Sequence, residues 1–402
     1  MKYVIVLGDG MADEPVDELG GVTPLEAADT PVMDRLAREG RTGRFTTVPQ
    51  GFHPGSEVAN MTVLGYDVTK AFEGRGVLEA ASMGVDVPDG VMAMRCNLIT
   101  VADGKIKNHS GGHISSEEAA ALIATLQKEL GNDIVEFHPG VSYRHLLMIK
   151  GGDKHIACTP PHDVPGTPFA DVMVKAELPE AEATASLVND LILRSQEILA
   201  SHPVNLKRIA EGKDPANSIW PWSPGYRPSM EPLSERFPIK DGVVISAVDL
   251  IFGIGVYAGL RPVTVEGATG LYDTNYEGKA QAAIDALRDG ADFVFLHVEA
   301  SDEAGHEGDV KLKKRTIEYL DSRILAPIVR YSDSLDEPLA IAVLPDHPTP
   351  CHLRTHTSDP VPFLIYKPGV APDDVTVFSE KSVAHGAYGT VAGDEFMNLL
   401  MK

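Results

Sequence analysis

The chain has 402 residues, a length at which two or three domains are expected. Its 58 acidic residues outnumber 35 basic ones, which gives a formal net charge of −23. This charge disfavours nucleic acids and anionic membranes as partners, so an anionic substrate needs a local cluster of cations or metal ions. The three cysteines, Cys96, Cys158 and Cys351, lie far apart, which argues against a disulfide framework and indicates a reducing compartment.

The first apolar segment, Tyr3 to Leu7, is followed at once by Gly8, Asp9 and Gly10. We interpret it as a β-strand, because five apolar residues are too few for a secretory signal. Asp9 then lies at a strand end, where the flanking glycines let a ligand approach the backbone. The pattern matches neither GxxxxGK[ST] nor GxGxxG, so a nucleotide cradle of these kinds is not predicted.

Ser56 precedes an apolar pattern, Val58, Met61 and Leu64, that is typical of a helix. It is therefore predicted at a helix N-terminus, where free N–H groups and the helix dipole stabilise an alkoxide or a phosphate ester. A serine at this place is more commonly an N-cap, and the local sequence leaves both interpretations open.

The residue pattern changes at residues 101–177, and this segment is predicted to form a small α/β insertion. Ser115 and Glu118 form a capping box that opens a helix, and a strand is expected at Tyr143 to Ile149. Several basic side chains stand out in this acidic chain, and they are either ligand contacts or ordinary surface residues: His109, His113, Arg144 and His162.

Asp292 to Val298 predicts a buried strand that leads into an acidic segment. Asp302 and His306 follow it and are four residues apart, so one helical turn brings both side chains to one face.

Farther upstream, the apolar window Val243 to Leu260 is interrupted by Asp249. A membrane span needs about 20 mostly apolar residues, so this window predicts a strand and a helix of a soluble, cytoplasmic protein.

A second buried strand is predicted at Leu339 to Leu344, and Asp346 and His347 stand where it ends. His356 follows nine residues after His347. A carboxylate beside an imidazole at the carboxyl end of a parallel strand is typical of a divalent-metal site. A solvated, histidine-rich loop is the alternative for this segment alone. Cys351 lies in the same loop, and we expect it to be a bystander.

Strand ends on one edge of a sheet converge, so the separate strand and helix ends are expected to form one site. Seven oxygen and nitrogen ligands suit two metal ions better than one. They are Asp9, Ser56, Asp302, His306, Asp346, His347 and His356. A serine hydroxyl bound to such a pair loses its proton more easily and becomes a nucleophile, which points to a phosphate or sulfate ester as the substrate.

The chain also resembles a known family over essentially its whole length, in five motifs that occur in the family's order. They are GDGM with Asp9, GSEVAN with Ser56, HVEASDEAGHEGD with Asp302 and His306, PDH with Asp346 and His347, and RTHTSDPVPF with His356. This set is similar to the cofactor-independent phosphoglycerate mutases of the archaeal type, which belong to the alkaline phosphatase superfamily.

The resemblance implies an α/β fold of the alkaline phosphatase kind, with a mainly parallel sheet sandwiched by helices. The metal-binding core would comprise residues 1–100 and 178–402, and residues 101–177 would be a cap over the substrate. It further implies two divalent ions, manganese, magnesium or zinc. Asp9, Ser56, Asp346 and His347 would hold one ion, and the other would be bound by Asp302, His306 and His356.

The implied activity is the interconversion of 3-phosphoglycerate and 2-phosphoglycerate in glycolysis and gluconeogenesis, without 2,3-bisphosphoglycerate. Ser56 would be the nucleophile and would carry the phosphoryl group as phosphoserine. The candidate substrate contacts are Arg75, His109, His113, Arg144, His162 and Arg227.

Two features depart from this pattern. ANSIWPWSPG and ISAVDLIFGIGVYAGL resemble a bacterial subgroup proposed to phosphorylate homoserine, and Phe252 stands where the family commonly has a lysine. If that lysine assists catalysis or binding, Arg227 is a candidate to replace it. A homoserine-kinase-like phosphotransferase, a phosphomonoesterase and a metal-stabilised scaffold therefore remain as alternatives.

Overall fold

The computed structural model describes residues 1–402, and the chain divides into two compact units. The first, here called the core, comprises residues 1–72 and 229–402, and the second, the insertion, comprises residues 73–228. The insertion is longer than the expected residues 101–177. The reason is that β3 (Val91–Ala102) and β9 (Ser218–Gly225) pair with each other, which draws both flanks into one sheet.

The core contains an eight-stranded sheet with the order β11-β10-β12-β1-β13-β14-β2-β15. Neighbouring strands from β11 to β13 run parallel, whereas β14 is antiparallel to both β13 and β2. The strands are β1 (Lys2–Gly8), β2 (Arg41–Thr46), β10 (Gly242–Ile245), β11 (Arg261–Val263), β12 (Phe293–Val298), β13 (Leu339–Leu344), β14 (Val361–Tyr366) and β15 (Thr390–Ala392). The expected α/β class with a mainly parallel sheet is confirmed.

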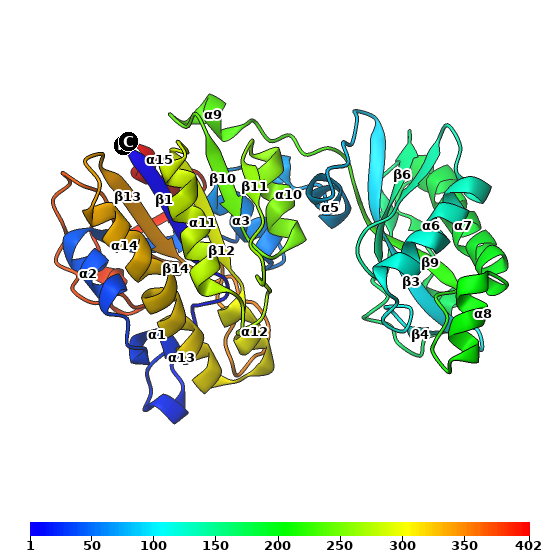
Figure 1. The fold of residues 1–402 in the computed structure, drawn as a ribbon, viewed down its shortest axis with the longest axis horizontal. Helices are drawn as coiled ribbons and strands as arrows, with labels where there is room; N and C mark the ends of the chain where they lie inside the picture. Colours follow the sequence, from blue (N-terminus) through cyan, green and yellow to red (C-terminus); the bar gives the residue numbers. More distant parts are fainter. The chain divides into compact units, whose positions relative to one another are not determined.

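The central strands are apolar on both faces because both faces are buried. In β1, Val4 and Val6 point to one face and Ile5 and Leu7 to the other, and all four are fully buried. Three helices and a π-helical segment pack on the face of Val4 and Val6. These are α2 (Pro31–Glu39), α11 (Tyr276–Arg288), Leu320–Leu325 and α14 (Ala326–Asp333). Figure 1 shows α11 and α14 lying over these strands.

A glycine allows helix α10 (Asp249–Tyr257) to pack closely on β10. A Cβ atom at Gly255 would lie 2.4 Å from Cγ1 of Val244, so no other residue fits there without movement. Helix α10 also packs against α3 (Ser56–Val63), the helix that begins with Ser56. The packing therefore holds the N-terminus of α3 in place.

The C-terminal part of the core contains a long interrupted helix and a short edge strand. Helix α13 (Val310–Tyr319) continues through the π-helical segment into α14, which ends at Asp333. Strand β15 pairs with β2 and precedes α15 (Glu395–Met401). Edge strands of three residues give little periodic signal in a sequence.

The short remaining helices of the core are α1 (Pro24–Ala27), α4 (Val68–Ala71), α9 (Leu233–Arg236) and α12 (Ala300–Glu307).

The insertion has an antiparallel sheet with the order β4-β3-β6-β5, and β9 pairs with β3 as well. Its further elements are β4 (Lys105–Asn108), β5 (Val135–His138), β6 (Arg144–Lys150), β7 (Ile156–Ala157), β8 (Lys175–Ala176), α5 (Arg75–Ser82), α6 (Ser116–Leu130), α7 (Glu182–Ala200) and α8 (Pro203–Ala210). Apolar residues of α6 and α7 form one cluster with those of the sheet. The predicted capping box of Ser115 and Glu118 is present at the start of α6.

The apolar window at residues 243–260 forms β10 and α10, as the sequence predicts. No helix in the structure combines the length and apolar character that crossing a membrane requires.

A buried histidine makes the insertion sensitive to acid. His145 in β6 is 2% exposed, and its Nδ1 accepts a hydrogen bond from the Gly140 N–H at 3.0 Å. Its Nε2 is buried without a partner. Burial lowers the pKa of His145 to about 4, because a charged imidazole loses its hydration there.

Below pH 6.5 the unfolded chain protonates His145 while the folded chain does not, so stability falls between pH 6.5 and 4. At pH 5 this loss amounts to about 2 kcal/mol. His145→Asn keeps an acceptor but does not titrate, and we expect it to remove most of the loss. Urea unfolding at pH 7.5 and 5.0 measures the effect through Trp220 and Trp222, which both lie in the insertion. Exposed His113→Asn is the control, and equal pH sensitivity in both variants would contradict the prediction.

Candidate active site

The carboxyl ends of three adjacent parallel strands bring the predicted ligands together. Asp9 follows β1, Asp346 and His347 follow β13, and Asp302 lies in α12 directly after β12. Three of these four side chains are 0 to 1% exposed, and Asp302 is 5% exposed. The convergence that the sequence predicts at this sheet edge is therefore present.

Asp302, His306 and His356 form one part of the site. The Nε2 atoms of His306 and His356 lie 3.2 and 3.3 Å from the two carboxylate oxygens of Asp302. These two Nε2 atoms are 2.9 Å apart, closer than two imidazole nitrogens lie without a shared proton or ion. The i, i+4 spacing in α12 brings Asp302 and His306 to one face, as predicted.

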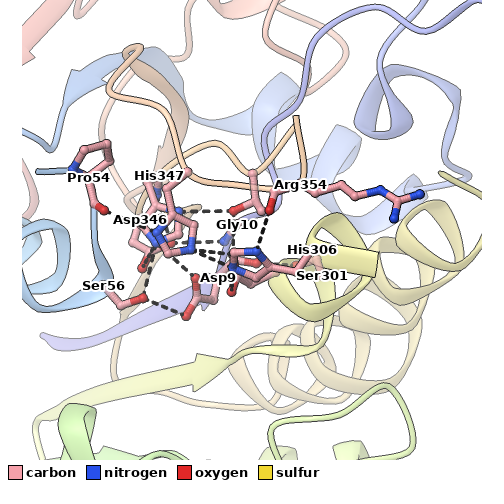
Figure 2. A network of polar contacts seen from close by, with 12 residues as sticks. Asp9, Gly10, Pro54, Ser56, Ser301, His306, Asp346, His347 and Arg354 are labelled. Carbon is pink, nitrogen blue, oxygen red and sulfur yellow. Dashed lines mark hydrogen bonds and ion pairs between the residues drawn. The ribbon is translucent and has the colours of Figure 1, made fainter. Parts of the chain in front are cut away.

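Ser56 forms the second part of the site with Asp9, Asp346 and His347. The N-cap of α3 is Gly55 and Ser56 is the first helical residue, so the N-cap interpretation is wrong. Instead its Oγ lies 3.2 Å from Nε2 of His347 and 3.5 Å from Oδ2 of Asp9. Figure 2 shows Ser56 pointing toward both residues. Nε2 of His347 in turn lies 3.5 Å from Oδ2 of Asp346.

The acids are held by donors that sequence reasoning missed. Oδ1 of Asp346 accepts hydrogen bonds from the backbone N–H groups of Gly10 and His347, and its Oδ2 accepts one from Nδ2 of Asn60. The Thr349 hydroxyl donates to Oδ1 of Asp302. Asn60 is four residues after Ser56 in the predicted helix, a spacing that places both on one face. Thr349 gave no comparable signal.

His297 was also missed as a part of the site. It is fully buried in β12, and its Nε2 lies 2.9 Å from Oδ2 of Asp9. An imidazole within an otherwise apolar strand was the available signal, because a buried polar group needs a partner.

The three carboxylates share one buried region and influence each other's ionisation. Burial raises the pKa of Asp9 well above its usual value, and the charges of Asp346, Asp302 and Glu299 raise it further. Burial also opposes ionisation of Asp302, but hydrogen bonds from His306 and His356 outweigh it and hold the pKa of Asp302 well below its usual value. A cation near Asp9 would reverse the repulsion there.

The pKa values of the imidazoles shift in different directions, according to burial and hydrogen-bond partners. The hydrogen bond to Asp302 raises the pKa of His306 to about 9. Burial works against the charged form of His356, yet its bond to Asp302 raises the pKa as a net effect. Burial lowers the pKa of His347, and it lowers that of His297 to about 3.

The residues of this site fit divalent cations. Oδ1 of Asp9 is buried without a hydrogen-bond partner, which is costly unless a cation occupies that side. Ligand atoms lie within 4.8 Å of one another in two groups, one of Asp302, His347 and His356 and one of Asp9, His297 and Asp346. Carboxylate oxygens with imidazole nitrogens suit divalent transition metals. Cys351 is in neither group, and its N–H instead donates to the carboxylate of Asp13.

The insertion contains a separate cavity of about 330 Å³ that gathers two of the predicted substrate contacts, His109 and His162. Arg95, Asn97, Tyr143 and Trp222 complete its lining. The guanidinium of Arg95 lies 4.4 Å from the centre of the Trp222 ring and pairs with Glu79. Arg95 was not predicted, because an arginine inside a strand has no distinctive spacing.

The other predicted contacts divide into two groups. The charges of Arg75 and Arg144 act on Arg95 and, after the dominant effect of burial, help to lower its pKa, so both add positive charge near the cavity. His113 is exposed on a turn with φ of 53°, and Arg227 pairs with Asp86 at 3.1 Å. The structure does not bring His113 or Arg227 to the lining of this cavity.

Fold and site together define a class of protein: an α/β chain whose parallel sheet presents two carboxylate–imidazole groups for cations beside a serine at a helix N-terminus. Comparison with known proteins makes this class specific. The family described as 2,3-bisphosphoglycerate-independent phosphoglycerate mutase matches residues 37–205. A protein of that name from Methanosarcina acetivorans is 52% identical over 405 residues, which cover 100% of both chains.

Solved structures agree with this match. A protein from Pyrococcus horikoshii is 32% identical, with a TM-score of 0.83 over 100% of this chain and 96% of its own. A cofactor-independent phosphoglycerate mutase from Thermoplasma acidophilum is 28% identical, with a TM-score of 0.69 over 100% and 99%. The chain belongs to the family of 2,3-bisphosphoglycerate-independent phosphoglycerate mutases, and the resemblance seen in the sequence is confirmed.

A side chain does not fit at Gly10, so we expect substitution there to disturb the neighbouring ligands. Its φ is 60°, and an added Cβ would lie 2.5 Å from Oδ1 of Asp302 and 2.6 Å from Oγ1 of Thr349. Gly10→Ala should displace Asp302 and weaken Mn²⁺ binding by about tenfold or more, which titration calorimetry measures. Gly20→Ala has similar backbone strain, at φ of 78°, but nothing within 4 Å, so its Mn²⁺ affinity should not change. Equal affinities in both variants would contradict the prediction.

Proposed function

We propose that this chain interconverts 3-phosphoglycerate and 2-phosphoglycerate without 2,3-bisphosphoglycerate, with Ser56 as the nucleophile. The observation that carries the proposal is the placement of the Ser56 hydroxyl, which lies at the first residue of α3 and faces Asp9 and His347. Membership of the mutase family supports the choice of substrate.

Two divalent metal ions would be held by these residues, manganese most readily, with magnesium or zinc as the other choices. Asp9, Ser56, Asp346 and His347 would bind one ion, and Asp302, His306 and His356 would bind the other. The ions, when bound, would stabilise negative charge on the phosphoryl oxygens and lower the pKa of the serine hydroxyl. By distance His347 belongs to the group of Asp302 and His356. Its Nε2 also lies 3.6 Å from Oδ1 of Asp9 and 3.5 Å from Oδ2 of Asp346, and this, with its contact to Ser56, supports its placement with the first ion.

In the first step, Ser56 Oγ loses its proton and forms a bond to phosphorus while the bond from phosphorus to the 3-oxygen of glycerate breaks. The 3-oxygen takes up a proton, and the enzyme holds the phosphoryl group as phosphoserine. In the second step, the 2-hydroxyl loses its proton and attacks this phosphorus, the bond from phosphorus to Ser56 Oγ breaks, and Oγ takes up a proton, so the cycle has no net proton change. The free N–H groups at the start of α3 stabilise the phosphoryl charge throughout.

The cavity in the insertion offers groups that suit the carboxylate and hydroxyl of a glycerate. Arg95 supplies a guanidinium for the carboxylate, and His109 and His162 supply imidazoles for the hydroxyl or carboxylate. Arg75 and Arg144 add positive charge to this region. Turnover as a mutase requires that water is kept from the phosphoserine, because hydrolysis would turn the mutase into a phosphatase.

Phosphorus NMR of Mn²⁺-loaded protein with 3-phosphoglycerate alone tests this proposal. The expected result is a 2-phosphoglycerate signal that grows to equilibrium without free phosphate. Free phosphate as the main product would indicate a phosphomonoesterase, and an unchanged spectrum would overturn the proposed activity.

Phosphotransfer to homoserine is not proposed. The relative from Methanosarcina acetivorans aligns over the whole chain and is named a phosphoglycerate mutase. Phe252, which replaces the family's common lysine, lies half-buried on α10. Arg227 pairs with Asp86, so the structure gives no support to its replacing that lysine.

Ser56→Ala should abolish the interconversion, with a fall in kcat of at least about 10⁴-fold, because no nucleophile remains. The thermal unfolding curve should stay close to that of the wild type, since the N-cap of α3 is Gly55 and not Ser56. Phosphorus NMR gives the rate, and mass spectrometry of acid-quenched wild type should show a phosphoryl group on the peptide that contains residue 56. Substantial turnover by Ser56→Ala would rule out this nucleophile.

His162→Ala should raise KM for 3-phosphoglycerate by about tenfold, because one neutral or charged hydrogen bond to the substrate is lost. Burial lowers the pKa of His162, so this side chain is largely neutral at pH 7. The matched control is His138→Ala, since His138 lines a different cavity of the insertion. An equal KM in both variants would remove His162 from the substrate site.

A further inference from the structure

His297 lies between Asp9 and Ser246 and has a defined partner on each ring nitrogen. Nε2 is 2.9 Å from Oδ2 of Asp9, and Nδ1 is 3.2 Å from Oγ of Ser246. His297 is fully buried and Ser246 is 1% exposed, so no water competes for these contacts. The Nζ group of Lys279 donates to the backbone oxygen of His297 at 3.0 Å and anchors this residue from the helix side.

The hydrogen bonds define where the imidazole proton sits. Oγ of Ser246 accepts the backbone N–H of Val248 at 3.1 Å, which leaves the serine O–H free to donate. The ionised carboxylate of Asp9 can only accept, so Nε2 of His297 donates to its Oδ2, and Nδ1 is left to accept from the Ser246 hydroxyl. The proton of the neutral ring therefore sits on Nε2 and is donated to Oδ2 of Asp9.

This arrangement decides whether His297 is a metal ligand. Its distance places it in one group of possible ligands, with Asp9 and Asp346. A nitrogen that carries a proton has no lone pair for a cation, so Nε2 is not available while Ser246 donates to Nδ1. Oδ2 of Asp9 is engaged by His297, whereas Oδ1 is buried without a hydrogen-bond partner.

We propose that His297, oriented by Ser246, is a positioning residue that leaves Oδ1 of Asp9 to bind the cation next to Ser56. The inference rests on the proposed function, since it assigns a role toward the metal of that site. By fixing Oδ2, His297 also sets the orientation of the carboxylate relative to Oγ of Ser56, 3.5 Å away. The role is held by a buried chain of three side chains, Ser246, His297 and Asp9.

Mn²⁺ titration calorimetry of the full chain tests the role of His297. His297→Leu removes the donor at similar volume, and we expect a loss of about 10- to 100-fold in affinity at one of two sites. His297→Gln can donate an amide N–H to Asp9, so it should recover most of this affinity. The exposed His385→Leu is the control in the same unit. Unchanged affinity of both sites in His297→Leu would overturn the inference.

The tautomer gives a second test, which does not depend on how well the leucine variant folds. Nitrogen-15 NMR of histidine-labelled, Mg²⁺-loaded wild type should show the His297 proton on Nε2, and Ser246→Ala should lose this preference. A proton on Nδ1 in the wild type would mean that Nε2 binds the metal, which contradicts the positioning role.

The two proposals fail in different ways. If no 2-phosphoglycerate forms but the Mn²⁺ and tautomer results hold, the proposed activity fails and the positioning role stands. If turnover is normal and His297→Leu binds Mn²⁺ as the wild type does, only the positioning role fails.

Discussion

Burying like charges in one place is the constraint on which the rest of this structure depends. Asp9, Asp302 and Asp346 lie at the same sheet edge, and none is more than 5% exposed. Carboxylates taken out of water repel one another and lose hydration, and either protons or cations must compensate. The unpartnered oxygen of Asp9 marks where compensation is incomplete within the protein itself. The acidic site therefore suits cations, and the catalytic role proposed for Ser56 depends on them.

The fold supplies what such a site needs. Parallel strands that are apolar on both faces end together, so their polar last residues meet over a rigid base. Backbone N–H groups, Asn60 and Thr349 then hold individual carboxylate oxygens, which leaves little freedom for the ligands to rearrange. Lys313 and Asp13 form a buried ion pair. Nζ of Lys313 also donates to the backbone oxygen of Thr349, so it connects the loop of Thr349 to the segment after β1.

The sequence predicted this edge well because Asp9, Asp346 and His347 closely follow strands and Ser56 begins a helix, at points where the pattern changes from apolar to polar. It also placed Ser56 at a helix start, but only the structure shows that its hydroxyl faces Asp9 and His347, because a local sequence does not give the direction of a side chain. His297, Ser246 and Arg95 were missed because their partners are 51 or more residues away, or lie across a sheet, and no local spacing records such pairs. The insertion boundaries were missed for the same reason, because the pairing of β3 with β9 is long-range.

The most direct test of the central claim is an anomalous difference map from crystals of the Mn²⁺-loaded protein. The account predicts two peaks, one bound by Oδ1 of Asp9 with Ser56, Asp346 and His347, and one bound by Asp302, His306 and His356. A single peak, or a peak coordinated by Nε2 of His297, would contradict it.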